Sequence, residues 1–309
     1  MKKPELLVTP VSVGDIVPLS IAGADAFVIG EQRYGLRLAG EFDRDAIVKA
    51  VDLAHSHNKK VYIAMNAIFH NEKVDEFEDY IHFLKEAKAD AVIFGDPAVL
   101  MAARLAAPEM KLHWNTETTA TNWYTCNYWG RKGARRAVIA REINIDAIVE
   151  MKEHAEVELE VQVHGMTAMF QSKRSLLGNY FEYQGKAMEV ENRQQAGDMF
   201  LHDKERDNKY PIFEDENGTH IMSPNDICMI DELQEMVEAG IDSFKIDGIL
   251  KCPEYILEVT KLYRKAIDLC VENPDQYDEE KHSLFANIEE LQPENRPLDT
   301  GFFFKETVY

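Results

Sequence analysis

The sequence predicts an α/β fold, a (β/α)8 TIM-like barrel in which eight parallel strands alternate with helices. Two observations predict it: eight short apolar runs lie along the 309 residues, and one sequence unit recurs four times. The copies occupy residues 22–30, 87–95, 132–140 and 239–247. In three copies a glycine stands where a helix is expected to end, because glycine adopts the left-handed conformation without a Cβ clash. A short apolar run, typical of a strand buried on both faces, follows in each.

Each of these apolar runs is an expected strand. They are Leu6–Thr9, Ala26–Gly30, Lys60–Asn66, Ala91–Asp96, Lys111–Thr116, Ala137–Glu142, Glu158–His164 and Ser243–Asp247. Helical patterns fill most intervals, with Asp43, Asn71 and Asn144 as expected N-caps, and helical spacing resumes after Asp226. A doubly wound open sheet is the alternative, but no glycine-rich phosphate loop follows the first strand.

Two segments depart from this alternation. Residues 165–225, between the seventh and eighth strands, are too long for an ordinary connection. Within them, Asn217-Gly218 predicts a hairpin between Tyr210–Phe213 and Thr219–Met222. We therefore assign residues 1–272 to the barrel with its insertion. Residues 273–309 are expected to form an acidic C-terminal tail that docks through Phe302–Phe304, since three exposed phenylalanines would be costly.

Composition excludes several classes of protein. Hydrophobic residues make up 45% of the chain, which rules out disorder, and no apolar stretch approaches the roughly 20 residues of a membrane span. The four cysteines lack CxxC spacing, so neither a zinc site nor a disulfide framework is expected, and a reduced cytoplasmic location fits. The net charge of −21 disfavours coating of nucleic acid by charge alone. The densest basic cluster, Arg131, Lys132, Arg135 and Arg136, is interpreted as a solvated helix end rather than an RNA contact.

The carboxyl ends of the expected strands supply the candidate site residues, because barrel enzymes keep their sites at that face. Arg141 beside Glu142 is a candidate anion clamp, and Lys245 is a candidate for binding a carboxylate or phosphate. His164 is a candidate general base, metal ligand or anion donor, with a structural hydrogen-bonded histidine as the alternative. Further candidates for binding a small molecule are Asn115 and Glu117. No catalytic residue is assigned, because no nucleophile elbow, HExxH motif or P-loop is present.

Five segments together resemble one known family. They are Tyr34–Gly40, Glu160–Gly165, Ser223–Cys228, Ser243–Gly248 and Thr300–Phe304. They resemble the collagenase-like peptidases, a peptidase family numbered 32 whose mechanism is unassigned, and the resemblance spans nearly the whole chain. Within that family the chain looks most like the shorter subunit of a bacterial pair that 5-hydroxylates the wobble uridine of tRNA. The resemblance implies a barrel-like fold and a reaction that draws on prephenate.

The chain departs from the family at its cysteines. The resemblance implies an iron–sulfur cluster held by four cysteines, but Ala168, Ser175 and Ala196 stand at three of those positions here. Cys228 is left as the lone family-position cysteine, and one thiolate cannot hold a cluster that usually takes four. The family's Lys-Ile-Glu-Gly-Arg segment also appears here as Lys245–Ile249, without the arginine. No metal or cofactor is therefore expected in this chain, and the cluster is expected only in the paralogous partner.

Three functional hypotheses follow. The first is a non-redox subunit of a heteromeric tRNA hydroxylase that works with the cluster-bearing paralogue, meets tRNA through the complex, and takes a small carboxylate metabolite as candidate ligand. The second is a peptidase, a hydrolase in which Cys228 and His164 would form the nucleophile pair. The third is a purely structural partner without any ligand. No membrane contact is expected in any of them.

Overall fold

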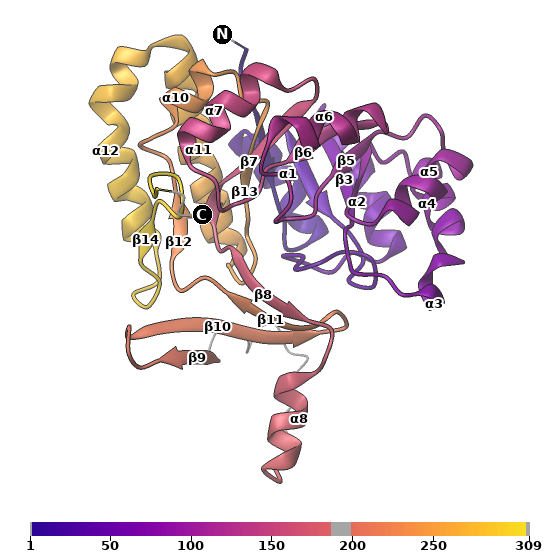
Figure 1. Ribbon diagram of the computed structural model, residues 1–309. Coiled ribbons are helices and arrows are strands. Elements are labelled where there is room, and N and C mark those ends of the chain that lie inside the picture. The colour runs from indigo at the N-terminus through magenta and orange to yellow at the C-terminus, as the bar shows by residue number, and fades with distance from the viewer. Residues whose placement is uncertain (1, 187–198, 307–309) are drawn as a thin grey trace.

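The computed structural model describes residues 2–186 and 199–306 and shows a closed barrel of eight parallel strands (Figure 1). The ring closes because the last barrel strand pairs with both the first and the seventh. The strands are β1 (Glu5–Val8), β2 (Ala26–Ile29), β3 (Lys60–Met65), β4 (Ala91–Phe94), β5 (Leu112–Trp114), β6 (Ala134–Val138), β7 (Glu158–Gly165) and β13 (Ser243–Ile246). The predicted fold is confirmed. The strand expected at Ala137–Glu142 begins three residues earlier, so Arg141 and Glu142 lie in the loop that follows it.

Helices cover the outside of the barrel. They are α1 (Ile16–Ala22) after the short η1 (Val13–Asp15), α2 (Arg44–Ser56), α3 (Asn71–Val74), α4 (Phe77–Glu86), α5 (Pro97–Ala106), α6 (Trp123–Arg131), α7 (Ile145–His154), α10 (Gln234–Glu238) and α11 (Pro253–Glu272). Asp43 and Asn144 cap α2 and α7 as predicted, each accepting a hydrogen bond from the third backbone N–H beyond it. The cap expected at Asn71 is wrong, because Asn71 is already the first residue of α3. None of the described helices is long and apolar enough to cross a membrane.

The recurring sequence unit is a repeated joint between helix and strand. Its expected left-handed position is occupied by Gly23, Gly133 and Gly240, with φ of 107°, 105° and 78°. The fourth copy has Lys88 at that position, also left-handed with φ of 61°. The joint therefore turns the chain in the same way in all four copies.

An aspartate two residues after the left-handed position fastens the joint in three copies. Asp25, Asp90 and Asp242 each accept a hydrogen bond, at 2.8–3.0 Å, from a backbone N–H of the preceding strand. The fourth copy has Arg135 instead, and there the pairing of β5 with β6 shifts register between Leu112 and His113. The carboxylate thus accompanies regular pairing at the start of a strand.

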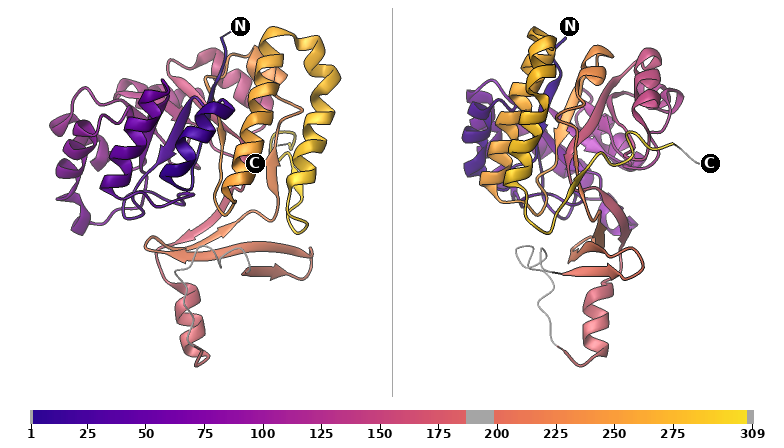
Figure 2. Two further views of the ribbon diagram at one scale, coloured as in Figure 1. Left: turned by 180° about the vertical axis from the view of Figure 1, so that it is seen from behind. Right: turned by 90° about the vertical axis from the view of Figure 1, so that its left-hand side faces the viewer.

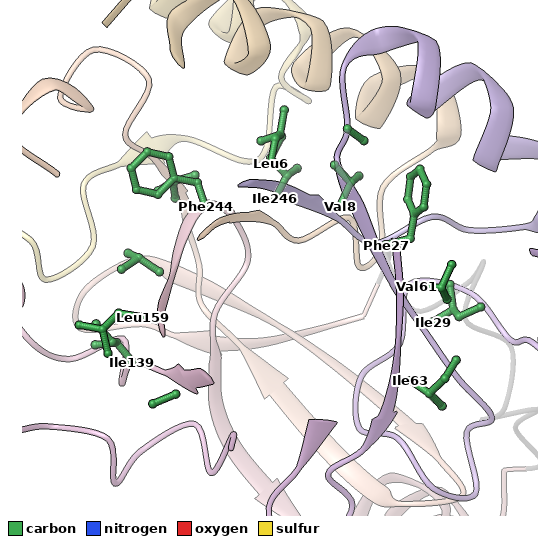
Figure 3. Packing of buried hydrophobic residues seen from close by; sticks show 14 of the residues in the cluster. Leu6, Val8, Phe27, Ile29, Val61, Ile63, Ile139, Leu159, Phe244 and Ile246 are labelled. Carbon is green, nitrogen blue, oxygen red and sulfur yellow. The ribbon is translucent and has the colours of Figure 1, made fainter. Parts of the chain in front are cut away.

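Alternation along the strands separates two apolar clusters. Side chains such as Leu6, Val8 and Ile246 point outward and pack against the helices, as Figure 3 shows for neighbouring strands. The intervening residues, including Leu7 and Val28, form a smaller cluster inside the barrel. The barrel is therefore filled by side chains.

The insertion forms a separate antiparallel sheet beside one end of the barrel, with α8 projecting from it (Figures 1 and 2). Its elements are β8 (Ala168–Ser172), α8 (Leu176–Tyr183), β9 (Phe200–Asp203), β10 (Asn208–Asp215) and β11 (Gly218–Met222). The hairpin predicted around Asn217-Gly218 is present as β10 and β11, whose pairing extends to Asp215 and Gly218 and leaves a two-residue turn. The Asn217 amide donates to the carbonyls of Gln32 and Gly35, so this turn is fastened to the loop after β2.

The segment from residue 273, expected as a tail, instead contains the helix α12 (Pro274–Leu291) packed against α11. Tyr277, Leu284 and Ile288 fall on one face of that helix and are buried. The following β14 (Leu298–Asp299) pairs with β12 (Asp226–Cys228), a short strand that also pairs with β7. Of the three terminal phenylalanines only Phe303 is buried, while Phe302 and Phe304 are about half exposed.

Candidate functional site

Two neighbouring cavities occupy the carboxyl end of the barrel. The inner cavity, of about 30 Å³, lies at the strand ends and is bordered by Arg37, Lys245 and Asp247 among others. The outer cavity, of about 360 Å³, lies between the barrel, the inserted sheet and the C-terminal segment. Glu117 and Arg141 border both cavities. The two cavities therefore meet at a pair of oppositely charged side chains.

Glu117 lies at the centre of the charged groups in this mouth. Its carboxylate accepts hydrogen bonds from Arg37 and, at 3.4 Å, from Nη2 of Arg141. Its backbone N–H donates to Oδ1 of Asn115 at 3.0 Å. Burial alone would raise the pKa of Glu117, but the charges of Arg37 and Arg141 outweigh it and lower the pKa to about 2. Glu117 is therefore ionised at every physiological pH.

Arg37, which strand-end reasoning missed, is held from the inserted sheet as well as from the barrel. Its Nη1 lies 3.3 Å from Nδ1 of His220 and 3.4 Å from Oε1 of Gln171. An arginine only donates, so Nδ1 of His220 accepts and the opposite Nε2–H donates to Asp215 at 2.9 Å. The side chains of His220 and Asp215 are buried. The insertion thus fixes the position of a cation at the mouth.

The backbone is strained at this mouth. Arg37, Glu117 and Leu250 have positive φ, at 49°, 65° and 58°, although none is a glycine. Residues held in such conformations concentrate at functional sites, where the surrounding structure over-determines them. Both members of the Arg37–Glu117 ion pair belong to this group, which marks the pair as part of a built site.

Arg141 and Lys245 lie where a small anion would bind. In the described part of the chain, the hydrogen bonding of the Arg141 guanidinium consists of its 3.4 Å contact with Glu117, so donors remain that face the cavities. Nζ of Lys245 donates to Asp247 at 2.9 Å. Three cations, Arg37, Arg141 and Lys245, and three carboxylates line the inner cavity. One of those carboxylates, Glu160, is also paired with Arg136 at 3.3 Å. Glu142, by contrast, is exposed at the rim of the outer cavity.

His164 lies outside the barrel mouth, behind its wall. Its ring nitrogens face the hydroxyls of Tyr255, at 2.7 Å, and Tyr263, at 3.4 Å. Burial lowers the pKa of His164 to about 3, so the ring stays neutral. The direction of the side chain follows from a bulge, since Ile246 pairs with His164 where regular alternation would pair it with Val163. The candidate roles at the mouth therefore do not fit His164, and the alternative of a structural histidine does.

Cys228 is buried on the same outer side. Its Sγ lies 3.7 Å from the Tyr263 hydroxyl, and burial raises the pKa of the thiol to about 12. Its neighbour Ile227 borders the outer cavity, and successive side chains of a strand point to opposite faces. The thiol is therefore protonated and turned away from the outer cavity, unlike a nucleophile that must meet a substrate.

The residues at the family's cluster positions do not fit an iron–sulfur cluster. Ala168 borders both cavities and offers no ligand, Ser175 is exposed, and Ala196 lies outside the described residues. Cys228 faces away from Ala168 and its cavities. Residues 2–186 and 199–306 contain no group of three His, Cys, Asp or Glu side chains that could hold a metal ion. The cavity wall near Ala168 therefore lacks the thiolates that clusters require.

A second cluster of buried charges surrounds Asp226 in the Ser223–Cys228 segment, and we call it the sealed cluster. Asp226 accepts hydrogen bonds from Lys251, Arg296 and, at 2.5 Å, Gln292. Burial would raise the pKa of Asp226, but the charges of Lys251 and Arg296 outweigh it and lower the pKa. Gln292 also accepts from Tyr255, which connects this cluster to His164. The sealed cluster thereby fastens the C-terminal segment to the barrel.

The basic cluster of the sequence divides in the structure. Arg136 is inside the barrel rather than at the surface, with its guanidinium paired to Glu5, Glu158 and Glu160 at 2.7–3.3 Å. Arg131, Lys132 and Arg135 are exposed, as expected of a helix end.

Comparison with known proteins gives both a family and a fold. The model of peptidase family U32 matches residues 17–308. In sequence, the chain is 71% identical to tRNA hydroxylation protein P2 of Bacillus subtilis over 309 residues, which covers all of both chains. It is 34% identical over 307 residues to tRNA hydroxylation protein P1 of the same organism, covering 98% of this chain and 71% of that one. Among solved structures, dihydrodipicolinate synthase from Bacillus anthracis matches with a TM-score of 0.52 and 8% identity, covering 95% of this chain and 85% of that one, which shows the barrel fold alone.

Proposed function

We propose, since this chain belongs to peptidase family U32, that it is a subunit required for the 5-hydroxylation of the wobble uridine in tRNA. The observation that carries the proposal is the 71% identity, over the full length of both chains, to tRNA hydroxylation protein P2 of Bacillus subtilis. The similarity to P1 of the same organism supports a paired system in which the second member is a paralogue.

In this pair the cluster belongs to the paralogue, and this chain supplies binding and positioning. The missing thiolates at Ala168 and Ser175 support that division of roles. Arg141 and Lys245 would hold a small carboxylate, for which the prephenate implied by the family resemblance is the candidate. Glu117 and Arg37 would fix Arg141 in the direction of the ligand. A tRNA substrate supports a cytoplasmic location for the proposed heteromer.

We do not extend the proposal to peptidase activity. A thiol nucleophile must be ionised and accessible, and the Cys228 thiol is neither. The family name therefore describes descent rather than a reaction supported by this site.

The test is nucleoside mass spectrometry of tRNA from a strain that lacks this gene and any duplicate pathway. The wild-type gene should restore wobble hydroxylation, whereas the double variant Arg141→Ala/Lys245→Ala should restore little, because both cations for the carboxylate are gone. The matched control is Lys261→Ala/Lys265→Ala on α11, whose lysines pair with glutamates at the surface and should be dispensable. Circular dichroism melts establish that both double variants fold. Unchanged hydroxylation without the gene would end the proposal, and full rescue by the Arg141/Lys245 variant would reduce the chain to a purely structural partner.

A further inference from the structure

We infer that the exposed face of α6, with the adjoining end of α5, is a docking surface for the phosphate backbone of RNA. We call it the α6 face and define it by Tyr124, Tyr128, Arg131, Lys132 and Arg104. The inference deepens the proposed function, because it rests on an RNA substrate and names the surface of this chain that meets it.

The α6 face combines aromatic rings with cations. Tyr124 and Tyr128 are one helical turn apart and are 64% and 46% exposed. The Arg131 guanidinium lies 5.9 Å from the ring centroid of Tyr124, and Nζ of Lys132 lies 5.6 Å from that of Tyr128. Rings that stack on bases next to cations that contact phosphates are the usual composition of a single-stranded RNA surface.

The cations of this face lack carboxylate partners. Arg135 pairs with Glu158 at 3.6 Å, but within the described ranges no ion pair is found for Arg104, Arg131 or Lys132. Most other exposed lysines and arginines of helices such as α11 are paired, as Lys261 and Lys265 are. Unpaired cations attract phosphates without first having to give up a carboxylate.

The charge of this region opposes that of the whole chain. Between residues 97 and 135 the exposed charged side chains are five basic and one acidic, a net charge of +4; they are Arg104, Lys111, Arg131, Lys132, Arg135 and Glu109. The chain as a whole carries −21. An RNA would therefore be repelled by most of the surface and attracted here, which orients it as it approaches.

The α6 face extends from the mouth to the opposite end of the barrel, because α6 starts after β5 and ends, at Arg131, where β6 begins. The loop from Glu117 to Asn122 leads from the two cavities directly into α6, and Thr118 borders the outer cavity. The nine residues of α6 span about 13 Å along the barrel wall. A nucleotide at the outer cavity could thus be followed by its own backbone along the helix.

A protein partner is the competing occupant, because Met101 and Leu105 on the neighbouring α5 are 64% and 72% exposed. Arg104 lies between them on α5, and its guanidinium donates to the Lys132 carbonyl, so a cation joins the two helices. A patch with three unpaired cations is costly to bury against a protein unless carboxylates meet each one. The unpaired cations therefore favour RNA over a protein as the occupant of the α6 face.

The experiment measures binding of an anticodon stem-loop RNA by fluorescence anisotropy across a series of salt concentrations. It uses the full chain, alone and with its cluster-bearing paralogue. Arg131→Gln/Lys132→Gln should weaken binding about tenfold and reduce the salt slope by about 1.5, since each lost phosphate contact removes roughly 0.7–0.9. Tyr124→Ala/Tyr128→Ala should weaken binding about tenfold while leaving the slope unchanged. Lys261→Gln/Lys265→Gln, the matched control, should change neither.

Unchanged affinity and slope in the Arg131/Lys132 variant would overturn the inference, as would the absence of RNA binding by the wild-type chain in both forms. Loss of association with the paralogue, with RNA binding intact, would also overturn it and reassign the face to protein. The proposed function fails separately: wild-type chain that binds RNA through this face, yet whose deletion leaves wobble hydroxylation unchanged, would contradict the function and support the surface.

Discussion

Two clusters in this molecule have the same chemical composition, a carboxylate between two cations. At the mouth, Glu117 lies between Arg37 and Arg141. In the sealed cluster, Asp226 lies between Lys251 and Arg296. The side chain of Asp226 is 0% exposed and none of its cluster borders either cavity, whereas Glu117 and Arg141 are 18% and 16% exposed and border both.

The difference teaches that composition alone does not separate structural from functional charge. Asp226 also accepts from Gln292, so its oxygens are saturated by the protein. Arg141 keeps donors that no described residue uses, and the backbone beside it is strained at Glu117. Unsatisfied hydrogen-bond donors next to a cavity indicate a binding site, whereas polar groups that are fully hydrogen-bonded within the protein indicate a structural role.

The largest expected effect is on the sealed cluster. Asp226→Asn should lower the free energy of unfolding by about 3–5 kcal/mol, because it leaves Lys251 and Arg296 buried without a full counter-charge. Urea denaturation measures the loss. Glu279→Gln, an exposed change on α12, is the control and should cost less than about 0.5 kcal/mol. A similarly small loss for Asp226→Asn would contradict the structural role of the cluster.

The next largest effect is a pH dependence of the free energy of unfolding, which arises beside the sealed cluster. His164, joined to the sealed cluster through Tyr255, has a pKa of about 3 when folded and near 6.5 when unfolded. The unfolded chain therefore binds a proton that the folded chain does not, so stability is complete above pH 6.5 and falls by up to about 4 kcal/mol as the pH drops towards 3. His164→Gln should flatten this decline, as followed by urea denaturation between pH 7 and 4. The exposed His82→Gln should leave it unchanged, and an equal decline in both variants would contradict the assignment.

A smaller effect is expected at the mouth. The pKa of Glu117 is lowered to about 2, so its contribution of about 2–3 kcal/mol is present above pH 4.5 and is lost as the pH falls towards 2. Glu117→Gln should remove it at neutral pH, yet cost less than Asp226→Asn because Arg37 keeps its contacts with His220 and Gln171. Denaturation at pH 7 measures the stability lost in Glu117→Gln, and denaturation of the wild-type protein at pH 3 measures the stability lost as the pH falls. Glu142→Gln at the rim is the control. A loss that exceeds that of Asp226→Asn would reverse the comparison.

The smallest effect concerns the thiol beside the sealed cluster. Cys228→Ala should cost about 1 kcal/mol, the value of a small buried side chain, because Tyr263 keeps its 2.8 Å hydrogen bond to the Val163 carbonyl. Wobble hydroxylation in cells should persist, as with the exposed Cys252→Ala. Abolished hydroxylation by a folded Cys228→Ala protein would show that the thiol takes part in chemistry.

The barrel was predictable because its signals are local. Gly23, Gly133 and Gly240 announce the left-handed ends of helices within a few residues of each apolar run. Lys88 carries no such signal, and only the repetition of the neighbouring sequence predicts its joint. Helix α12 was missed because acidic residues dilute an apolar stripe of only three buried side chains.

The site was predictable only where it follows strand ends. Asn115, Glu117, Arg141 and Lys245 reach the mouth for that reason. Arg37 sits within a long loop, and its contact with His220 joins residues 183 positions apart, which no local pattern reveals. His164 stands at a strand end too, but a bulge that the sequence does not announce turns it outward.

The exception among the repeated joints has a consequence for the whole barrel. Three joints carry an aspartate that grips the previous strand, and the fourth, between α6 and β6, carries Arg135 and an irregular seam. At this joint an exposed arginine stands where the other three joints have an aspartate that accepts a backbone hydrogen bond. The β5–β6 seam, one of the two barrel seams that shift register, thus lies beside the exposed cations of the α6 face.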